Sequence, residues 1–455
     1  MTITPYDIAT LVQRQYDALP AKRKPTVRGN GLREWVPLAG IVAQGNNDEL
    51  WCLSIATGMK CLPSSKIPQA QGNVLHDWHA EVLAIRAFNR FVLDECKALA
   101  QEGSSKFLRR RTKKEIHNSQ IREIKEEESW HGQPFTWKED ILLHMYCSEA
   151  PCGDASMELI MASQEDATPW ALPPELTPDI TTTTSPTPTL PGRAYFSHLG
   201  IVRRKPARPD APPTLSKSCS DKLALHQLTS LLSSLTSLLV SPSNAYLNSL
   251  ILPLSRYSAV ACHRAFSSSP GGRMSSLAYL NPSTSIFKTK GGYAFHPFAL
   301  LTTTLKFAFS QKQAKETAGE AGIAPSNISL AWTSSGLEEA TLGGVLQGRK
   351  QSTADARGAS FASRRRMWGR AVEVVDLLLS NPISSIVSSK DGDKEEGEVG
   401  EGEVDADIRK VLGAKTYGEV KESALLEARR RVKKEARAEA LKGWVRNLGD
   451  ESFSL

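Results

Sequence analysis

The chain has 455 residues, too many for one small module, and this length predicts one large domain with insertions or two domains. Lys and Arg (56) outnumber Asp and Glu (49), so the net charge of +7 modestly favours a polyanionic partner without identifying one. Seven scattered cysteines argue against a disulfide framework and indicate a reducing, intracellular compartment, nuclear or cytoplasmic.

Neither a secretory signal nor a membrane span is expected. The N-terminal residues lack a basic region followed by an apolar one. The longest apolar stretch, 223–240, is interrupted by polar residues and predicts a buried helix.

The first elements in chain order are a helix and a hairpin. Apolar residues at helical spacing predict an amphipathic helix over 6–20. Two runs rich in strand formers follow at 35–44 and 50–58, and the turn-like residues 45–48 separate them. Together these runs predict a β-hairpin.

A helix, a third strand and a short helix come next. Residues 77–93 carry a helical apolar face, 141–148 read as a strand, and 157–162 form a short apolar segment. The order strand, strand, helix, strand, helix predicts an α/β (α+β) fold with a mixed central sheet covered by helices.

Three stretches read as insertions and one as a terminal helix. Residues 103–129 are almost wholly charged or polar, 164–192 are too rich in Pro and Thr to pack, and about 388–407 form an acidic, Gly-rich linker. Residues 416–448 predict a long helix docked on the core through Trp444.

The sharpest chemical signal is His79-Ala80-Glu81 at a predicted helix start, followed downstream by Pro151-Cys152-Gly153. Zinc deaminases hold Zn²⁺ with one His and two Cys thiolates, and a Glu that is not a ligand moves protons between water, base and leaving amine. Residues two apart on a helix point in different directions, so His79 can bind metal while Glu81 faces the substrate. Cys152 precedes the 157–162 segment, whose free N–H groups would stabilise its thiolate.

The second Cys ligand departs from the usual spacing, because position 155 is Ala. We favour Cys219, which follows a capping serine at a predicted helix start. Cys147 is the main rival ligand and is interpreted as packing. The remaining cysteines lie in apolar surroundings and are expected to be buried thiols: Cys52, Cys61, Cys96 and Cys262.

Each of these signals has a simpler explanation. His-x-Glu occurs by chance in many proteins, a single His is more often structural, and Pro-Cys-Gly alone can be a turn. The combination of the three motifs, with the Glu in the expected place, favours catalytic zinc.

Several runs resemble the adenosine deaminase domain of RNA-editing enzymes: PLAGIVA (37–43), ATGMKCL (56–62), LHDWHAEVLAIRAFNRF (75–91), YCSEAPCGDAS (146–156) and KSCSDKLA (217–224). Residues 192–222, 241–253 and 343–350 are similar to the fungal, type 1 tRNA-specific adenosine deaminases. The resemblance implies a single domain over 1–455 with a cytidine-deaminase-like three-layer core and a large helical C-terminal part. It also implies zinc on His79, Cys152 and Cys219, with Glu81 as the proton shuttle.

The implied reaction converts adenosine to inosine in tRNA, at the adenosine immediately 3′ of the anticodon (position 37) of alanine tRNA. An anticodon loop already exposes its bases, and the roughly 30 residues before the deaminase motifs leave no room for a separate double-stranded RNA-binding domain. The alternatives are editing of duplex messenger RNA, a non-catalytic pseudo-deaminase that binds RNA, and an inositol-phosphate sensor. Retention of Glu81 argues against the pseudo-deaminase.

The resemblance further implies a buried inositol hexakisphosphate, surrounded by cations that could not be buried without their anion. The matching positions are Arg86, Lys222, Arg364, Tyr417, Lys421, Arg431 and Trp444. Two positions depart from the family, with Ile85 where an arginine is expected and His226 where the duplex-editing enzymes have Trp. The simpler alternative is that each cation is a surface charge on its helix.

For RNA contact the sequence favours Lys60, near the expected pocket mouth, and a clustered basic segment. The residues of that segment are Arg203, Arg204, Lys205 and Arg208. Clustered, Pro-interrupted cations favour phosphate contact over base reading. The alternative is a charged loop beside the 164–192 insertion.

Overall fold

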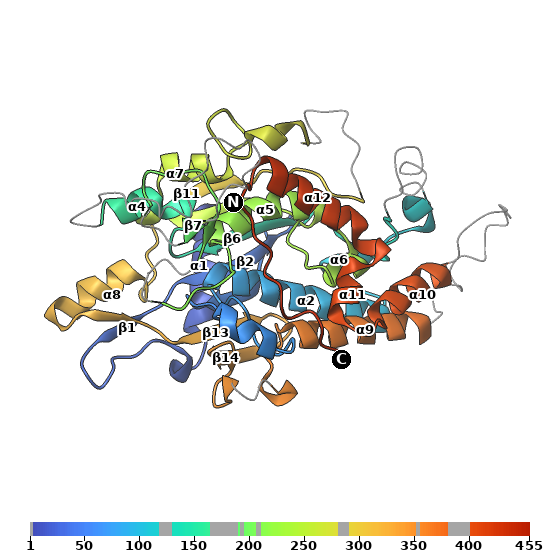
Figure 1. The fold of residues 1–455 in the computed structure, drawn as a ribbon, viewed down its shortest axis with the longest axis horizontal. Coiled ribbons are helices and arrows are strands. Elements are labelled where there is room, and N and C mark those ends of the chain that lie inside the picture. The colour runs from blue at the N-terminus through green and yellow to red at the C-terminus, as the bar shows by residue number, and fades with distance from the viewer. Residues whose placement is uncertain are drawn as a thin grey trace, which may run out of the picture.

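The computed structural model describes residues 3–117, 130–163, 190–191, 195–205, 211–280, 291–351, 355–380 and 401–455 (Figure 1). None of the helices in these ranges combines the length and apolar composition that a membrane crossing requires.

An eight-stranded mixed sheet forms the centre of the described chain. Its strands follow the order β11 (Ala299–Thr303), β10 (Leu247–Pro253), β6 (Leu142–Cys147), β2 (Leu38–Gln44), β3 (Leu50–Thr57), β13 (Ile328–Thr333), β14 (Glu338–Leu342) and β15 (Val345–Leu346). Strands β6, β10 and β11 are parallel to one another, and the other neighbours are antiparallel. The predicted mixed sheet and the β2–β3 hairpin are confirmed.

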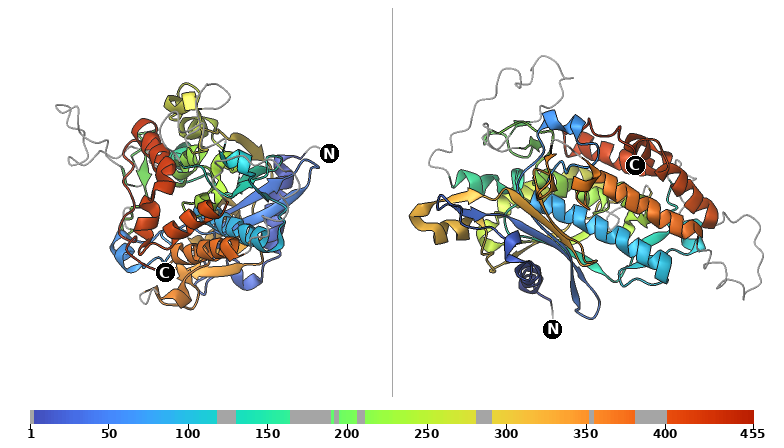
Figure 2. Two further views of the ribbon diagram at one scale, coloured as in Figure 1. Left: turned by 90° about the vertical axis from the view of Figure 1, so that its right-hand side faces the viewer. Right: turned by 90° about the horizontal axis from the view of Figure 1, so that it is seen from below.

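Helices cover both faces of this sheet. The helix α1 (Pro5–Asp17) packs on one face, and α2 (Ala80–Glu102) packs on the other beneath α9 (Arg364–Ser380), as the right-hand view of Figure 2 shows. Gly40 in β2 allows the approach of α1, because a Cβ there would lie 2.6 Å from a methyl of Val12. The expected three-layer arrangement is therefore confirmed.

Local signals account for the ends of the first two helices. Thr4 caps α1 and forms a reciprocal capping box with Asp7, which satisfies free N–H groups at the helix start. The helix α2 begins later and runs further than predicted, and it ends where Gly103 adopts a left-handed conformation with φ of 74°.

The remaining elements are short. The helices are α4 (Met157–Met161), α5 (Cys219–Thr229), α6 (Thr236–Leu239), α7 (Ala259–Phe266), α8 (Gln311–Ala318), α10 (Glu401–Leu412), α11 (Tyr417–Glu422) and α12 (Glu427–Glu439). Small sheets pair β1 (Arg33–Trp35) with β12 (Ile323–Pro325), β7 (Leu190–Pro191) with β8 (Arg203–Arg204), and β4 (Leu108–Arg110) with β5 (Phe135–Trp137) and β9 (Val240–Ser241).

The prediction of one buried helix over 223–240 is wrong. The helix α5 stops at Thr229, Ser230 adopts a positive φ of 54°, and α6 starts only at Thr236. Asn89 of α2 causes the break, because its amide donates to Leu231 O at 2.8 Å while its carbonyl accepts from the segment that follows. The stretch is buried as expected, but backbone groups between the two helices form hydrogen bonds with the Asn89 side chain of α2 instead of continuing a helix.

The single helix over 416–448 is also wrong. Thr416 caps α11, the backbone becomes extended at Ser423, and α12 ends at Glu439. Trp444 then follows in irregular structure and packs against the core, as expected for the docked end of the chain.

Two of the three expected insertions contribute partly to the core. Phe107 and Leu108 are buried where β4 pairs with β5, so 103–117 is not a wholly solvated segment, and 118–129 lie outside the described residues. The last residues of the linker belong to α10, whose Val404 and Ile408 are buried, whereas 388–400 lie outside the described residues. Of 164–192, only 190–191 are described, as strand β7.

Candidate metal centre

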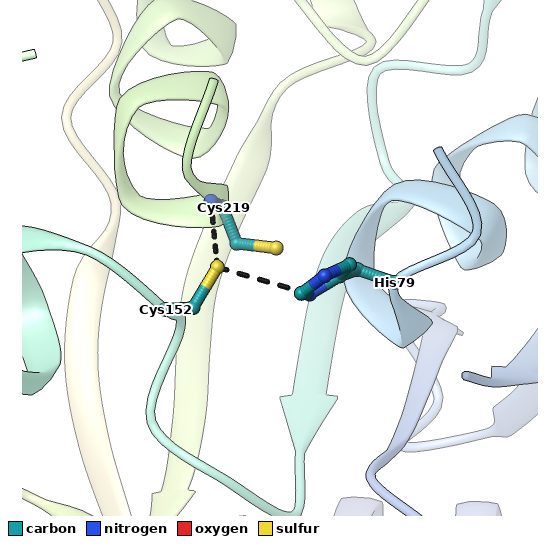
Figure 3. A group of neighbouring side chains, drawn as sticks. All are labelled: His79, Cys152 and Cys219. Carbon is teal, nitrogen blue, oxygen red and sulfur yellow. Dashed lines mark hydrogen bonds between the residues drawn. The ribbon is translucent and has the colours of Figure 1, made fainter. Parts of the chain in front are cut away.

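His79, Cys152 and Cys219 converge from three separate elements. His79 is the N-cap of α2, Cys152 lies in the turn after β6, and Cys219 is the first residue of α5. Their ligand atoms all lie within 4.8 Å of one another, and Cys152 Sγ is 3.7 Å from His79 Nδ1 (Figure 3). The structure thus brings together the three residues that the sequence predicted as metal ligands. Among the described residues this group does not include Cys147, which is buried in β6.

The turn that carries Cys152 is attached to the start of α5. Ser218 caps α5 by accepting from Asp221 N at 3.1 Å, and Ser220 Oγ donates to Pro151 O at 3.0 Å. Gly153, with φ of 101°, permits this contact, since a Cβ there would lie 2.2 Å from Ser218 Oγ. The glycine of the Pro-Cys-Gly motif therefore sets the separation of the two cysteines.

The environment of the two sulfur atoms favours one thiolate. Cys152 Sγ accepts a hydrogen bond from the backbone N–H of Cys219 at 3.3 Å. A hydrogen bond from the Cys219 side chain holds the pKa of Cys152 well below its usual range, whereas burial raises the pKa of Cys219. The stabilising helix start is that of α5, not that of the 157–162 segment as we expected.

A buried network of charges, which the sequence analysis missed, supports the ligands. Asp77 accepts from Lys205 Nζ at 2.9 Å, and it also accepts from Lys222 and Ser216. Lys205 Nζ additionally lies 3.3 Å from Cys219 Sγ. Although burial raises the pKa of Asp77, the ammonium groups of Lys205 and Lys222 hold it well below its usual range. The only sequence signal was an acidic residue two positions before His79.

Glu81 lies in the first turn of α2 beside this group. Its side chain is buried, and Oε2 has no hydrogen-bond partner among the residues that the structure describes. Burial raises the pKa of Glu81. A buried carboxylate oxygen without a partner is costly, and such atoms concentrate at functional sites.

A cavity lined by cations adjoins Glu81 and Cys219. The expected anion-binding residues that line it are Arg86, Lys222, Arg364 and Tyr417, together with the noncanonical position His226. Arg429, which the sequence analysis did not single out, also lines the cavity and is buried, with its guanidinium donating to Thr229 O at 2.8 Å. The cavity therefore gathers part of the predicted set and adds one cation.

The other predicted anion-binding residues lie around this cavity or outside it. Lys421 lies 3.8 Å from Glu451, and Trp444 packs below the cations of Lys217 and Arg437. Arg431 does not line the cavity in this structure; its side chain is about one third exposed and pairs with Glu427 at 3.0 Å. The structure therefore does not place Arg431 on this cavity.

A further cation of α12, Lys433, lies among like charges. Burial lowers the pKa of Lys433 well below its usual range, and the neighbouring charges of Arg429 and Lys421 lower it further. This part of α12 is thus a region of strong positive potential, which an anion would stabilise.

The structure corrects part of the predicted RNA-binding set. Lys205 is only 5% exposed, and its ammonium group forms hydrogen bonds with Asp77 and Cys219. Arg203 is 1% exposed, and its guanidinium donates a hydrogen bond to the carbonyl oxygen of Tyr195 at 3.1 Å. Neither side chain is available to a phosphate, so these two assignments were wrong. Lys60 is exposed beside Asn327, Arg204 is half-buried, and Arg208 lies outside the described residues.

Comparisons with known proteins agree with this site. A family model described as the adenosine-deaminase (editase) domain matches residues 54–448, which include all the metal-site and cavity residues named above. A Schizosaccharomyces pombe protein named tRNA-specific adenosine deaminase 1 is 39% identical over 320 residues, covering 70% of this chain and 73% of the relative. A Saccharomyces cerevisiae protein of the same name is 35% identical over 240 residues, or 50% and 54% of the two chains. A mouse double-stranded RNA-specific adenosine deaminase is 26% identical over 151 residues, which is 11% of its length.

Proposed function

Since the chain belongs to the adenosine-deaminase (editase) domain family, we propose that it hydrolyses an adenosine of tRNA to inosine. The observation that carries this proposal is the position of the buried Glu81 carboxylate, whose Oε2 has no hydrogen-bond partner among the described residues, beside the group of His79, Cys152 and Cys219. In the net reaction, water supplies the oxygen at C6 of adenine and ammonia leaves.

The three converging side chains would hold a zinc ion. One imidazole and two thiolates suit Zn²⁺, and three protein ligands are typical of catalytic zinc. When bound, the zinc would act as a Lewis acid and lower the pKa of water towards neutrality. The chain itself stabilises the negative charge on sulfur through the Cys219 N–H and the Lys205 ammonium.

Glu81 would carry the protons. Its carboxylate takes the two protons of the attacking water in turn and delivers one to N1 of the adenine ring and the other to the leaving amine. Burial raises the pKa of Glu81, which brings its basicity closer to the value that a proton shuttle needs near neutral pH.

The tRNA substrate is supported by the names of the fungal relatives. We propose the adenosine immediately 3′ of the anticodon in alanine tRNA, where the loop already exposes its bases. Lys60, which is exposed, and Arg204 and Arg208 of the basic segment are the proposed contacts to phosphate.

Inositol hexakisphosphate is the proposed occupant of the cation-lined cavity. Arg86, Lys222, Arg364 and Arg429 line one cavity, and a bound anion would offset the cost of gathering so many like charges there. Guanidinium and ammonium groups are the donors that bind phosphate oxygens most strongly.

Inosine mapping on total tRNA tests the enzyme, the substrate class and the position together. Purified full-length protein should produce inosine at position 37 of alanine tRNA, whereas a Glu81→Gln variant loaded with the same zinc should not. Conversion of a long RNA duplex at an equal or higher rate would instead indicate duplex editing. A protein that binds tRNA and zinc but forms no inosine on either substrate would be the pseudo-deaminase.

A further inference from the structure

The sulfur atom of Cys61 lies next to the metal centre and has no role in the mechanism above. Backbone pairing places it there: Leu62 N donates to His76 O at 2.9 Å, and Trp78 N donates to Lys60 O at 3.0 Å. Cys61 therefore pairs with Asp77, two residues before His79. Unlike the buried Cys52, Cys61 is partly exposed, so its assignment as a buried thiol was wrong.

Cys61 forms a second close group with Asp77 and His79. One ligand atom from each of these three residues lies within 4.8 Å of the others. The Nδ1 atom of the same imidazole faces Cys152 Sγ at 3.7 Å. The ring of His79 thus has sulfur neighbours from both Cys61 and Cys152.

The Asp77 carboxylate, the other acceptor in this group, already accepts four hydrogen bonds. Its Oδ1 accepts the backbone N–H of His79 at 3.0 Å. Its Oδ2 accepts from Lys205, Lys222 and Ser216. The sulfur of Cys61 is the less occupied acceptor in this group for an imidazole N–H of His79.

A His that binds metal through one ring nitrogen must carry its proton on the other, and the acceptor of that N–H fixes the tautomer and the ring orientation. The acceptor is commonly a carboxylate or a backbone carbonyl. We infer that Cys61 is a positioning residue that accepts the Nε2–H of His79 and so directs the Nδ1 lone pair to the metal. This inference rests on the proposed zinc site.

The charge distribution around the ring agrees with this assignment. Asp77 and the sulfur atoms of Cys61 and Cys152 all lie close to the imidazole of His79.

Zinc affinity of the full-length protein, measured by competition with a chelator, tests the inference. Cys61→Ala should weaken zinc binding by about 10- to 100-fold, the usual effect of removing the partner of a metal-binding His. Cys61→Ser retains an acceptor and should stay within a few-fold of wild type. Cys52→Ala, which removes a buried sulfur on the α1 side of the sheet, is the matched control and should bind zinc as wild type does.

Cobalt substitution gives a second readout that a packing role would not change. In the Co²⁺ protein, the exchangeable imidazole proton of the coordinated His should give a paramagnetically shifted NMR signal. That proton should exchange slowly with water in wild type and in Cys61→Ser, and rapidly in Cys61→Ala.

The outcomes separate this inference from the proposed function. Wild-type zinc affinity and slow proton exchange in Cys61→Ala would overturn the role of Cys61 and leave the deaminase proposal intact. Equal losses in Cys61→Ala and Cys61→Ser would also overturn it, because a hydroxyl accepts the same hydrogen bond. Wild-type protein without tightly bound metal would instead contradict the proposed zinc site.

Discussion

Lys205 offers the sharpest test of the buried charge network, because the sequence pattern and the structure assign it opposite roles. A basic, Pro-interrupted segment suggests a solvent-exposed phosphate contact, whereas the structure buries the ammonium between Asp77 and Cys219. Replacing Lys205 by Met keeps most of the length of the side chain and removes the ammonium group with its charge and hydrogen bonds.

The expected cost follows from the geometry. At 2.9 Å and an effective dielectric constant of about 20, the Lys205–Asp77 attraction is about 6 kcal/mol. Avoiding the burial of an ammonium offsets part of that loss, and breaking a buried pair typically costs 3–5 kcal/mol in total. Lys222 still neutralises Asp77 in the variant. We therefore expect a loss of unfolding free energy at the lower end of this range, about 3 kcal/mol.

Urea denaturation followed by tryptophan fluorescence measures this loss, with Lys60→Met as the control. Lys60 is exposed, so its replacement should change the unfolding free energy by less than about 0.5 kcal/mol while weakening tRNA binding. The reasoning is refuted if Lys205→Met is as stable as wild type and loses only tRNA affinity, since that result would indicate that Lys205 is a surface residue that contacts tRNA.

Three further predictions test the site. Glu81→Gln should keep its fold and zinc but lose deamination by about 10²- to 10⁴-fold, since an amide cannot shuttle protons; turnover within a few-fold of wild type would exclude Glu81 as the shuttle. Cys219→Ala should lose zinc by elemental analysis and Cys147→Ala should retain it, and the reverse pattern would move the third ligand to Cys147. Arg429→Met should lower the melting temperature and the amount of inositol hexakisphosphate released on acid denaturation, as measured by mass spectrometry. Arg431→Met, at a position of the same helix that does not line the cavity, should change neither. Wild-type protein that releases no polyphosphate would contradict the proposed occupant of the cavity.

Elements with a strong local pattern were predictable from the sequence. The β2–β3 hairpin follows from two strand-forming runs and a turn, and α1 follows from apolar spacing and a capping box. The broken helix over 223–240 was not predictable, because the interruption comes from Asn89, 142 positions before Leu231. Local propensity carries no information about such a distant partner.

The same distinction between local patterns and distant contacts applies to the candidate site. His79, Glu81 and Cys152 sit in recognisable motifs, and the structure brings them together with Cys219. The burial of Lys205 depends on Asp77, 128 positions away, so a local reading of the basic segment placed it at the surface. The sequence of α12 also did not show which of its consecutive arginines faces the core, because few apolar residues mark the inner face of this helix.

A series of buried charges connects the candidate metal centre to the cation-lined cavity. Positive and negative groups alternate from Lys222, which lines the cavity, through Asp77 and Lys205 to the sulfur of Cys219. Each inner charge has a neighbour of opposite sign, so the cost of burial falls on the two ends of the series. A metal ion at Cys219 would satisfy one end, and an anion beside Lys222 would satisfy the other. Binding at either end should therefore stabilise the same buried network that orients His79 through Asp77.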